Sequence, residues 1–109
     1  GYFKDIAAAT NLPVLAYDNV GRTHVPLAPA TVARLASDAP NFVGIKDSSG
    51  DLTQLAEYIR LCPPTFRAFI GRDSLIYGAL MYGAAGAVAA SAFWYAGHAL
   101  LLAQDGAQR

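Results

Sequence analysis

The sequence predicts an α/β fold made of about four parallel (β/α) units. Four short apolar runs begin near residues 13, 42, 66 and 87, and helix-like segments separate them. Intervals of about 20 to 30 residues suit right-handed crossovers between parallel strands. The chain has 109 residues, of which 54% are hydrophobic and 15% charged, so residues 1–109 fit one domain with a usable core.

The first unit is predicted to run from a short helix into a strand. Apolar residues have helical spacing over Tyr2–Thr10, and the apolar segment Val14–Tyr17 follows. A turn is expected at Asp18–Gly21. We expect a loop over Gly21–Ala28, because Pro26 discourages regular structure there.

The second unit contains the most informative strand. A helix is expected to begin at Pro29, because a proline is well tolerated in the first helical turn, and to end within Asp38–Asn41. The strand Phe42–Lys46 is apolar or small up to its final lysine, which is typical of a strand buried on both faces.

The remaining units follow the same pattern. Asp51, with Gln54 three residues later, resembles a capping box for a helix over Leu52–Leu61. The inner face of that helix is expected to carry Leu55, Tyr58, Ile59 and Cys62. The later elements are predicted to be a strand at Phe66–Gly71, a helix from Asp73 to Met81, a strand at Ala87–Ser91 and a final helix that includes Ala96–Ala103.

Composition excludes several classes of function. Lysine plus arginine and aspartate plus glutamate number 8 each, so nucleic acid and acidic membranes are poor candidates for partners. The single cysteine, Cys62, rules out an internal disulfide and a cysteine-cluster metal site, and His24 and His98 have no metal-ligand spacing. No signal peptide or membrane span is visible, so we expect a cytoplasmic protein.

Polar residues stand where the predicted strands end. They are Tyr17 with Arg22 just beyond it, Lys46, Asp73 and Ser91. Because the carboxyl ends of parallel strands meet at one side of a sheet, these groups are expected to converge. The alternative is that strand ends are polar simply because they meet water.

Lys46 is the candidate nucleophile among these groups. A desolvated amine loses its proton more easily and can attack a carbonyl carbon to give a Schiff base. A phenol such as that of Tyr17 suits the proton transfers of imine formation. The guanidinium of Arg22 can bind a carboxylate through two parallel N–H donors. The structural alternative is a lysine that extends to the edge of the sheet.

Four segments together resemble one known family. They are Pro13–Thr23, Val43–Asp51, Phe69–Asp73 and Gly83–Val88, which resemble motifs of the dihydrodipicolinate synthase / N-acetylneuraminate lyase family in the same order. The sequence departs from the family pattern at Val20, where a proline is usual, and at Phe93, where an asparagine is frequent.

The resemblance implies a class I, lysine Schiff-base carbon–carbon lyase on a TIM (β/α)8 barrel, usually as a homo-oligomer. Lys46 would condense with the ketone of pyruvate or another 2-oxo acid, and Tyr17 would relay protons. Arg22 would bind the carboxylate region of the substrate, and the backbone of Val88 would line the pyruvate site. No metal or organic cofactor is implied, because the imine itself accepts the electrons.

The resemblance covers only the second half of such a barrel, which typically needs ~250 residues. The family's Gly-Thr-Thr-like loop and a second tyrosine, both from the first half, have no counterpart here. An isolated half-barrel would expose two sheet edges. We therefore expect a partial TIM-barrel domain that belongs to a longer chain, in preference to closure by two copies or an open sheet, and little lyase activity from residues 1–109 alone.

Two other functions stay open. One is an aldolase that cleaves a 2-oxo-3-deoxy sugar acid or a sialic acid, although Arg22 within Gly-Arg-Thr argues mildly against the sialic acid branch. The other is a non-catalytic half-barrel that serves binding or assembly.

Overall fold

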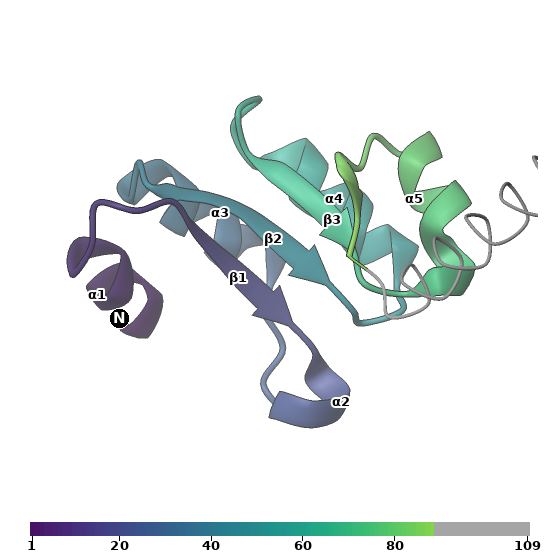
Figure 1. The fold of residues 1–109 in the computed structure, drawn as a ribbon, viewed down its shortest axis with the longest axis horizontal. Helices are drawn as coiled ribbons and strands as arrows, with labels where there is room; N and C mark the ends of the chain where they lie inside the picture. The colour runs from purple at the N-terminus through teal and green to yellow at the C-terminus, as the bar shows by residue number, and fades with distance from the viewer. Residues whose placement is uncertain (89–109) are drawn as a thin grey trace, which may run out of the picture.

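The computed structural model describes residues 1–88, which form one parallel sheet with helices packed behind it (Figure 1). The predicted α/β class with about four parallel units is confirmed. The elements are α1 (Tyr2–Ala8), β1 (Val14–Asp18), α2 (Val20–Thr23), α3 (Pro29–Asp38), β2 (Phe42–Asp47), α4 (Leu52–Leu61), β3 (Arg67–Ile70), the 3-10 turn η1 (Asp73–Leu75), α5 (Ile76–Met81) and β4 (Gly86–Ala87).

The strands lie side by side in the order of the chain, β1-β2-β3-β4, and every pair is parallel. β1 and β2 are in register such that Tyr17 pairs with Lys46 and Asp18 with Asp47. On its other side β2 pairs with β3, with Lys46 opposite Phe69. This register fixes which side chains meet at the carboxyl ends of the strands.

The two faces of the sheet differ because side chains alternate along each strand. One face packs against the helices, and Ile45 and Ile70 on it are completely buried. Burial of one such side chain is worth roughly 1.5–3 kcal/mol. Leu15 and Tyr17 on the opposite face are each about half exposed. The sheet is therefore covered on its helical side and open on the side that carries Lys46.

The apolar stripes of the helices match this arrangement. Val32 of α3 and Leu55 and Tyr58 of α4 are buried against the sheet, as is Cys62 just after α4. Of the inner-face residues predicted for α4, only Ile59 is partly exposed. Cys62 is a free, buried thiol, as its position at a helix end predicts.

The predicted loop over Gly21–Ala28 is wrong at its start, because α2 occupies Val20–Thr23. The carbonyl of Asn19 accepts hydrogen bonds from the backbone N–H groups of Arg22 and Thr23, both at 2.9 Å, which closes one helical turn. His24 then adopts φ 57°, a left-handed conformation that ends the turn. The hydrogen bonds to the Asn19 carbonyl thus form a helical turn, although Pro26, later in the same segment, discourages regular structure.

The predicted capping box is only half right. The carboxylate of Asp51 accepts hydrogen bonds from the N–H groups of Thr53 at 2.9 Å and Gln54 at 3.2 Å, so it caps α4 as expected. The side chain of Gln54 does not reach back to the cap, because it turns inward and bonds Asp18 and Tyr58.

The last predicted elements lie partly outside the described residues. β4 begins at Gly86, one residue before the predicted start, and the Val88 N–H continues the pairing with a 2.9 Å bond to the Ile70 carbonyl. Ser91, the end of the strand predicted at Ala87–Ser91, and the helix that includes Ala96–Ala103 fall outside the described residues.

Candidate active site

Lys46 and Tyr17 meet on the open face of the sheet. They are register partners at the carboxyl ends of β2 and β1, and the Lys46 Nζ lies 4.5 Å from the centroid of the Tyr17 ring. An amine over an aromatic face at this distance gains roughly 0.5–1 kcal/mol at an exposed site. Lys46 is half-buried, so its chain is held while its amine stays within reach of a ligand.

The pKa of the Tyr17 phenol is lowered. The largest cause of the lower pKa is the neighbouring Ser48 hydroxyl. The Asn19 amide, which donates to the phenol oxygen at 2.9 Å, lowers the pKa further, as do the positive charges of Lys46 and Arg22. Ser48 exerts this effect although its Oγ forms no well-aligned hydrogen bond in residues 1–88. The phenol of Tyr17 therefore loses its proton more readily than an ordinary tyrosine.

Arg22 stands on α2, just beyond β1, and is exposed. Neither Arg22 nor Lys46 forms an ion pair with any residue in the part of the chain that the structure describes. Two cations therefore flank Tyr17, and no carboxylate within residues 1–88 forms an ion pair with either of them. Such an arrangement suits an anionic ligand.

The other predicted strand-end groups are placed differently. Val88 follows β4 with its side chain 52% exposed, and its backbone is tied to β3. Asp73 begins η1 as an exposed residue and makes no hydrogen bond to Tyr17 or Lys46. Ser91 lies outside the described residues. The predicted convergence therefore holds for Tyr17 and Lys46, whereas for Asp73 it stays a prediction.

Ser48, Gly71 and Arg72 form a tight support beside Lys46 that sequence reasoning missed. A β-carbon at Gly71 would lie 1.9 Å from the Ser48 Oγ and 3.0 Å from the Lys46 Cε. The Gly71 N–H donates to the Asp47 carbonyl at 2.8 Å, and the Arg72 Nε donates to the Ser48 carbonyl at 3.0 Å. The loop after β3 therefore holds the end of the lysine strand. No signal in the sequence distinguishes this close approach from an ordinary strand-end glycine.

A buried polar cluster behind the lysine was also missed. Asp18 and Asp47 are both completely buried on the helical side of the sheet, and Gln54 and Tyr58 of α4 join Asp18. A signal for it exists in the sequence. Each aspartate directly follows one of the two candidate catalytic residues, so it must point to the opposite face of the sheet, toward the helices.

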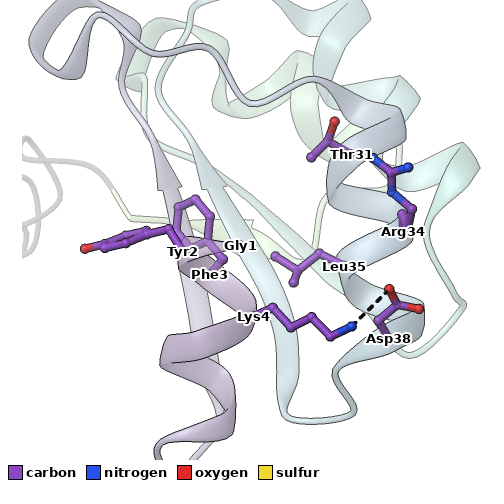
Figure 2. A pocket seen from close by; sticks show the side chains of 8 residues that line it. All are labelled: Gly1, Tyr2, Phe3, Lys4, Thr31, Arg34, Leu35 and Asp38. Carbon is purple, nitrogen blue, oxygen red and sulfur yellow. Dashed lines mark ion pairs between the residues drawn. The ribbon is translucent and has the colours of Figure 1, made fainter.

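A pocket of about 230 Å³ lies elsewhere, between α1 and α3 (Figure 2). Phe3 and Leu35 line it together with the ion pair of Lys4 and Asp38, whose charged atoms are 3.9 Å apart. Both charged side chains are at least half exposed, so the pair contributes little to stability. None of the residues that line this pocket belongs to the lysine face. A second pocket, of about 220 Å³, does reach that face, because Tyr17 lines it together with residues of α1 and of the segment 23–27.

Within residues 1–88, no three His, Cys, Asp or Glu side chains gather in a way that could hold a metal ion. None of the helices described has the length and apolar character of a membrane span.

Comparison with known proteins adds a family and a set of relatives. The model of the Dihydrodipicolinate synthetase family matches residues 1–104. The 4-hydroxy-tetrahydrodipicolinate synthase of Desulforamulus reducens is 45% identical over 91 residues, which are 84% of this chain and 31% of that protein. The chain therefore spans about three tenths of the length of the curated relatives that it matches.

Solved structures give the same picture. The 4-hydroxy-tetrahydrodipicolinate synthase from Methylacidiphilum fumariolicum SolV matches with a TM-score of 0.80 and 36% identity, over 83% of this chain and 30% of that one. The 2-keto 3-deoxygluconate aldolase from Picrophilus torridus matches with a TM-score of 0.77 and 32% identity, over 83% and 32%. The four parallel units are thus similar to a part of each of these larger proteins.

Proposed function

We propose, from the premise that this chain belongs to the Dihydrodipicolinate synthetase family, that it carries the reactive half of a Schiff-base lyase. The reaction is the condensation of pyruvate, or another 2-oxo acid, with an aldehyde. The observation that carries the proposal is the position of the Lys46 Nζ, 4.5 Å from the centre of the Tyr17 ring at two adjacent strand ends. The identity of the aldehyde is left open.

In the proposed mechanism the unprotonated Lys46 amine attacks the ketone carbon of the 2-oxo acid. The Tyr17 phenol gives its proton to the resulting alkoxide, takes one back from the Lys46 nitrogen and gives it to the departing hydroxyl, so that water leaves and an iminium ion forms. The Tyr17 phenolate then takes a proton from the adjacent carbon to give an enamine, this carbon forms the new bond to the aldehyde, and the aldehyde oxygen takes up the proton. The nitrogen of the iminium accepts the electron pair, so the residues named here suffice for the electron flow.

Two further residues complete the proposed site. Arg22, which has no ion-pair partner within residues 1–88, is assigned to the carboxylate region of the substrate. Val88 is assigned to the wall of the 2-oxo acid site through its backbone, which the bond to Ile70 holds at the end of the sheet. Both assignments are proposals that rest on position.

The proposal includes a barrel completed by further chain. Tyr2, Leu15 and Val25 lie toward the free edge and open face of β1 and are 74%, 51% and 61% exposed. Apolar side chains along an unpaired strand edge are normally shielded from water by another part of the protein. Closure of a barrel removes such edges. We take residues 1–109 as a partial TIM-barrel domain, in a homo-oligomeric protein whose partners are small molecules. The free thiol of Cys62 suits the reducing cytoplasm.

A second candidate reaction is aldol cleavage of a 2-oxo-3-deoxy sugar acid. The similarity to the 2-keto 3-deoxygluconate aldolase from Picrophilus torridus favours it. The same Lys46 iminium would serve, because cleavage runs the bond-forming step backwards. The two reactions differ in the aldehyde, so a panel of aldehydes tested with pyruvate separates them.

The test of the proposal is reductive trapping. The complete polypeptide, meaning the full-length protein that we propose carries this chain, is treated with pyruvate and borohydride, and intact mass and peptide mapping locate the adduct. We expect one adduct per chain, on Lys46, and none in Lys46→Arg. The absence of an adduct in the folded complete polypeptide would overturn the lyase proposal and favour a non-catalytic role.

The 109-residue chain, treated in the same way, tests the half-site expectation. We expect little or no adduct, because the first half of the site is not encoded in it. A stoichiometric adduct on Lys46 of this chain would show that the second half of the barrel suffices for imine formation.

A further inference from the structure

Two carboxylates are buried side by side directly behind the candidate reactive pair. Asp18 ends β1 and Asp47 ends β2, they are register partners, and neither side chain is exposed to solvent. Because side chains alternate, these aspartates face the helices while Tyr17 and Lys46 face the open side. The two aspartates therefore lie at the same two strand ends as the residues of the proposed chemistry, on the opposite face of the sheet.

Each carboxylate has one oxygen with a partner and one without. The Asp18 Oδ2 accepts from the Gln54 Nε2 at 2.5 Å and contacts the Tyr58 hydroxyl at 3.1 Å. The Asp47 Oδ1 accepts from the Ser49 N–H at 2.9 Å. The Asp18 Oδ1 and the Asp47 Oδ2 are buried and have no hydrogen-bond partner in residues 1–88.

Tyr58 cannot satisfy all the acceptors around it. Its hydroxyl has a single hydrogen, and it faces both the Leu27 carbonyl and the Asp18 carboxylate. The Gln54 Nε2 donates to the Tyr58 oxygen at 3.0 Å as well as to Asp18. The cluster therefore has more hydrogen-bond acceptors than donor hydrogens. One additional proton would reduce this shortage of donors.

No positive charge in the described part of the chain balances the pair. The other titratable groups near it are Tyr58 on α4 and Asp51 before α4, and Asp51 carries the same sign of charge. Arg72, which follows β3, donates to the Ser48 carbonyl instead. Two buried carboxylates without a cation do not both ionise readily. In agreement, burial first, and the charge of Asp18 next among the raising causes, raise the pKa of Asp47.

We propose that Asp18 and Asp47 share one proton, and that this pair is a positioning element that holds the ends of β1 and β2 in the register that sets Tyr17 against Lys46. One proton held by the pair leaves a single buried negative charge for Gln54 and Tyr58 to stabilise. The positioning role rests on the proposed lyase function, whereas the sharing of the proton does not.

The direct test is a pH titration of the aspartate side-chain carboxyl carbons by NMR, in the complete polypeptide without substrate. We expect one of the two carboxyls to remain protonated at a pH where exposed aspartates are ionised. In Asp18→Asn, which removes the neighbouring charge, the Asp47 titration should move to lower pH. Two carboxyls that both titrate in the same range as exposed aspartates, or an Asp47 titration unmoved in Asp18→Asn, would overturn the proposal.

A second measurement follows the free energy of unfolding against pH. The folded protein binds the proton of Asp47 more tightly than the unfolded chain, so stability is fully present below the unfolded pKa and is lost as pH rises through the folded one. Asp47→Asn should remove this decline. Asp51→Asn is the matched control, because asparagine caps a helix as well as aspartate does, and the decline should persist in it.

The positioning role has its own readout, the rate of borohydride-trapped imine formation with pyruvate. Either single asparagine variant keeps one carboxylate and should retain the rate within a few-fold. The double variant leaves the buried cluster without a negative charge and adds two amide NH2 groups to it, so it should lose about tenfold or more while still folding. An unchanged rate in the double variant would contradict the positioning role but not the sharing of the proton. If neither the parent nor any variant traps pyruvate, that result counts against the lyase proposal alone.

Discussion

Gly71 packs so closely against Ser48 that a β-carbon on Gly71 would lie 1.9 Å from the Ser48 hydroxyl oxygen. The same carbon would stand 3.0 Å from the Lys46 Cε. Real β-carbon contacts are essentially never as short as 1.9 Å, so any larger residue at position 71 must displace the serine and crowd the lysine. The glycine is thus a condition for the placement of the candidate nucleophile.

Gly71→Ala is therefore expected to destabilise the protein by about 1–3 kcal/mol, as overpacking of a tight site does. It should also slow imine formation, because the lysine chain moves. Denaturant unfolding and borohydride trapping measure the two effects. Gly86→Ala is the control, because its β-carbon would meet only the Phe69 ring at an ordinary 3.6 Å. Equal behaviour of the two variants would contradict the role given to Gly71.

Tyr17→Phe separates the ring from the phenol. The ring under the Lys46 amine remains, so we expect the lysine to keep its position, whereas loss of the proton relay should lower the rate of imine formation by about 10²–10⁴-fold. Stopped-flow absorbance or quenched trapping with pyruvate gives the rate. Tyr77→Phe, at a tyrosine 77% exposed on α5, should leave it unchanged. A Tyr17→Phe rate within a factor of two of the parent would exclude the relay.

The pH dependence of the rate tests the cause of the lowered Tyr17 pKa. The rate limb that reports ionisation of the phenol should lie below the ordinary value of 10.0, because Ser48 above all favours the phenolate. In Ser48→Ala this limb should move to higher pH, toward that value. Ser37→Ala, at a hydroxyl that bonds the Ala33 carbonyl on α3, serves as the control. A limb that stays in place in Ser48→Ala would assign the shift to Asn19 and the cations instead.

Asp51→Ala tests the start of α4, the helix that covers the lysine strand. The carboxylate accepts two backbone hydrogen bonds, so its removal should cost about 1 kcal/mol of unfolding free energy. Asp51→Asn should recover most of that loss. Chemical denaturation of the three proteins side by side makes the comparison, and an alanine variant as stable as the parent would show that tertiary packing alone fixes the helix start.

Much of the fold was predictable because its signals are local. The strand that carries Lys46 and the helix capped by Asp51 both follow from runs of residues that need no knowledge of distant contacts. The meeting of Tyr17 and Lys46 was predictable for a topological reason, since the carboxyl ends of adjacent parallel strands lie together.

The missed features depend on contacts between distant segments. Gln54 has the spacing of a capping residue, yet it bonds Asp18, which is 36 positions away in the sequence, because that buried carboxylate needs a donor. Asp18 and Asp47 each follow a strand and are therefore indistinguishable, one at a time, from polar turn residues. Only the register of β1 against β2 places them together.

The order of the strands in space is also the order in which a ribosome makes them. Each strand pairs with the one synthesised just before it, so β1 and β2 can associate before β3 has emerged. Tyr17 and Lys46 belong to this first pair. The two candidate catalytic residues thus lie on the earliest-made strands among those described, whereas Gly71 and Arg72, which contact the end of the lysine strand, are made later.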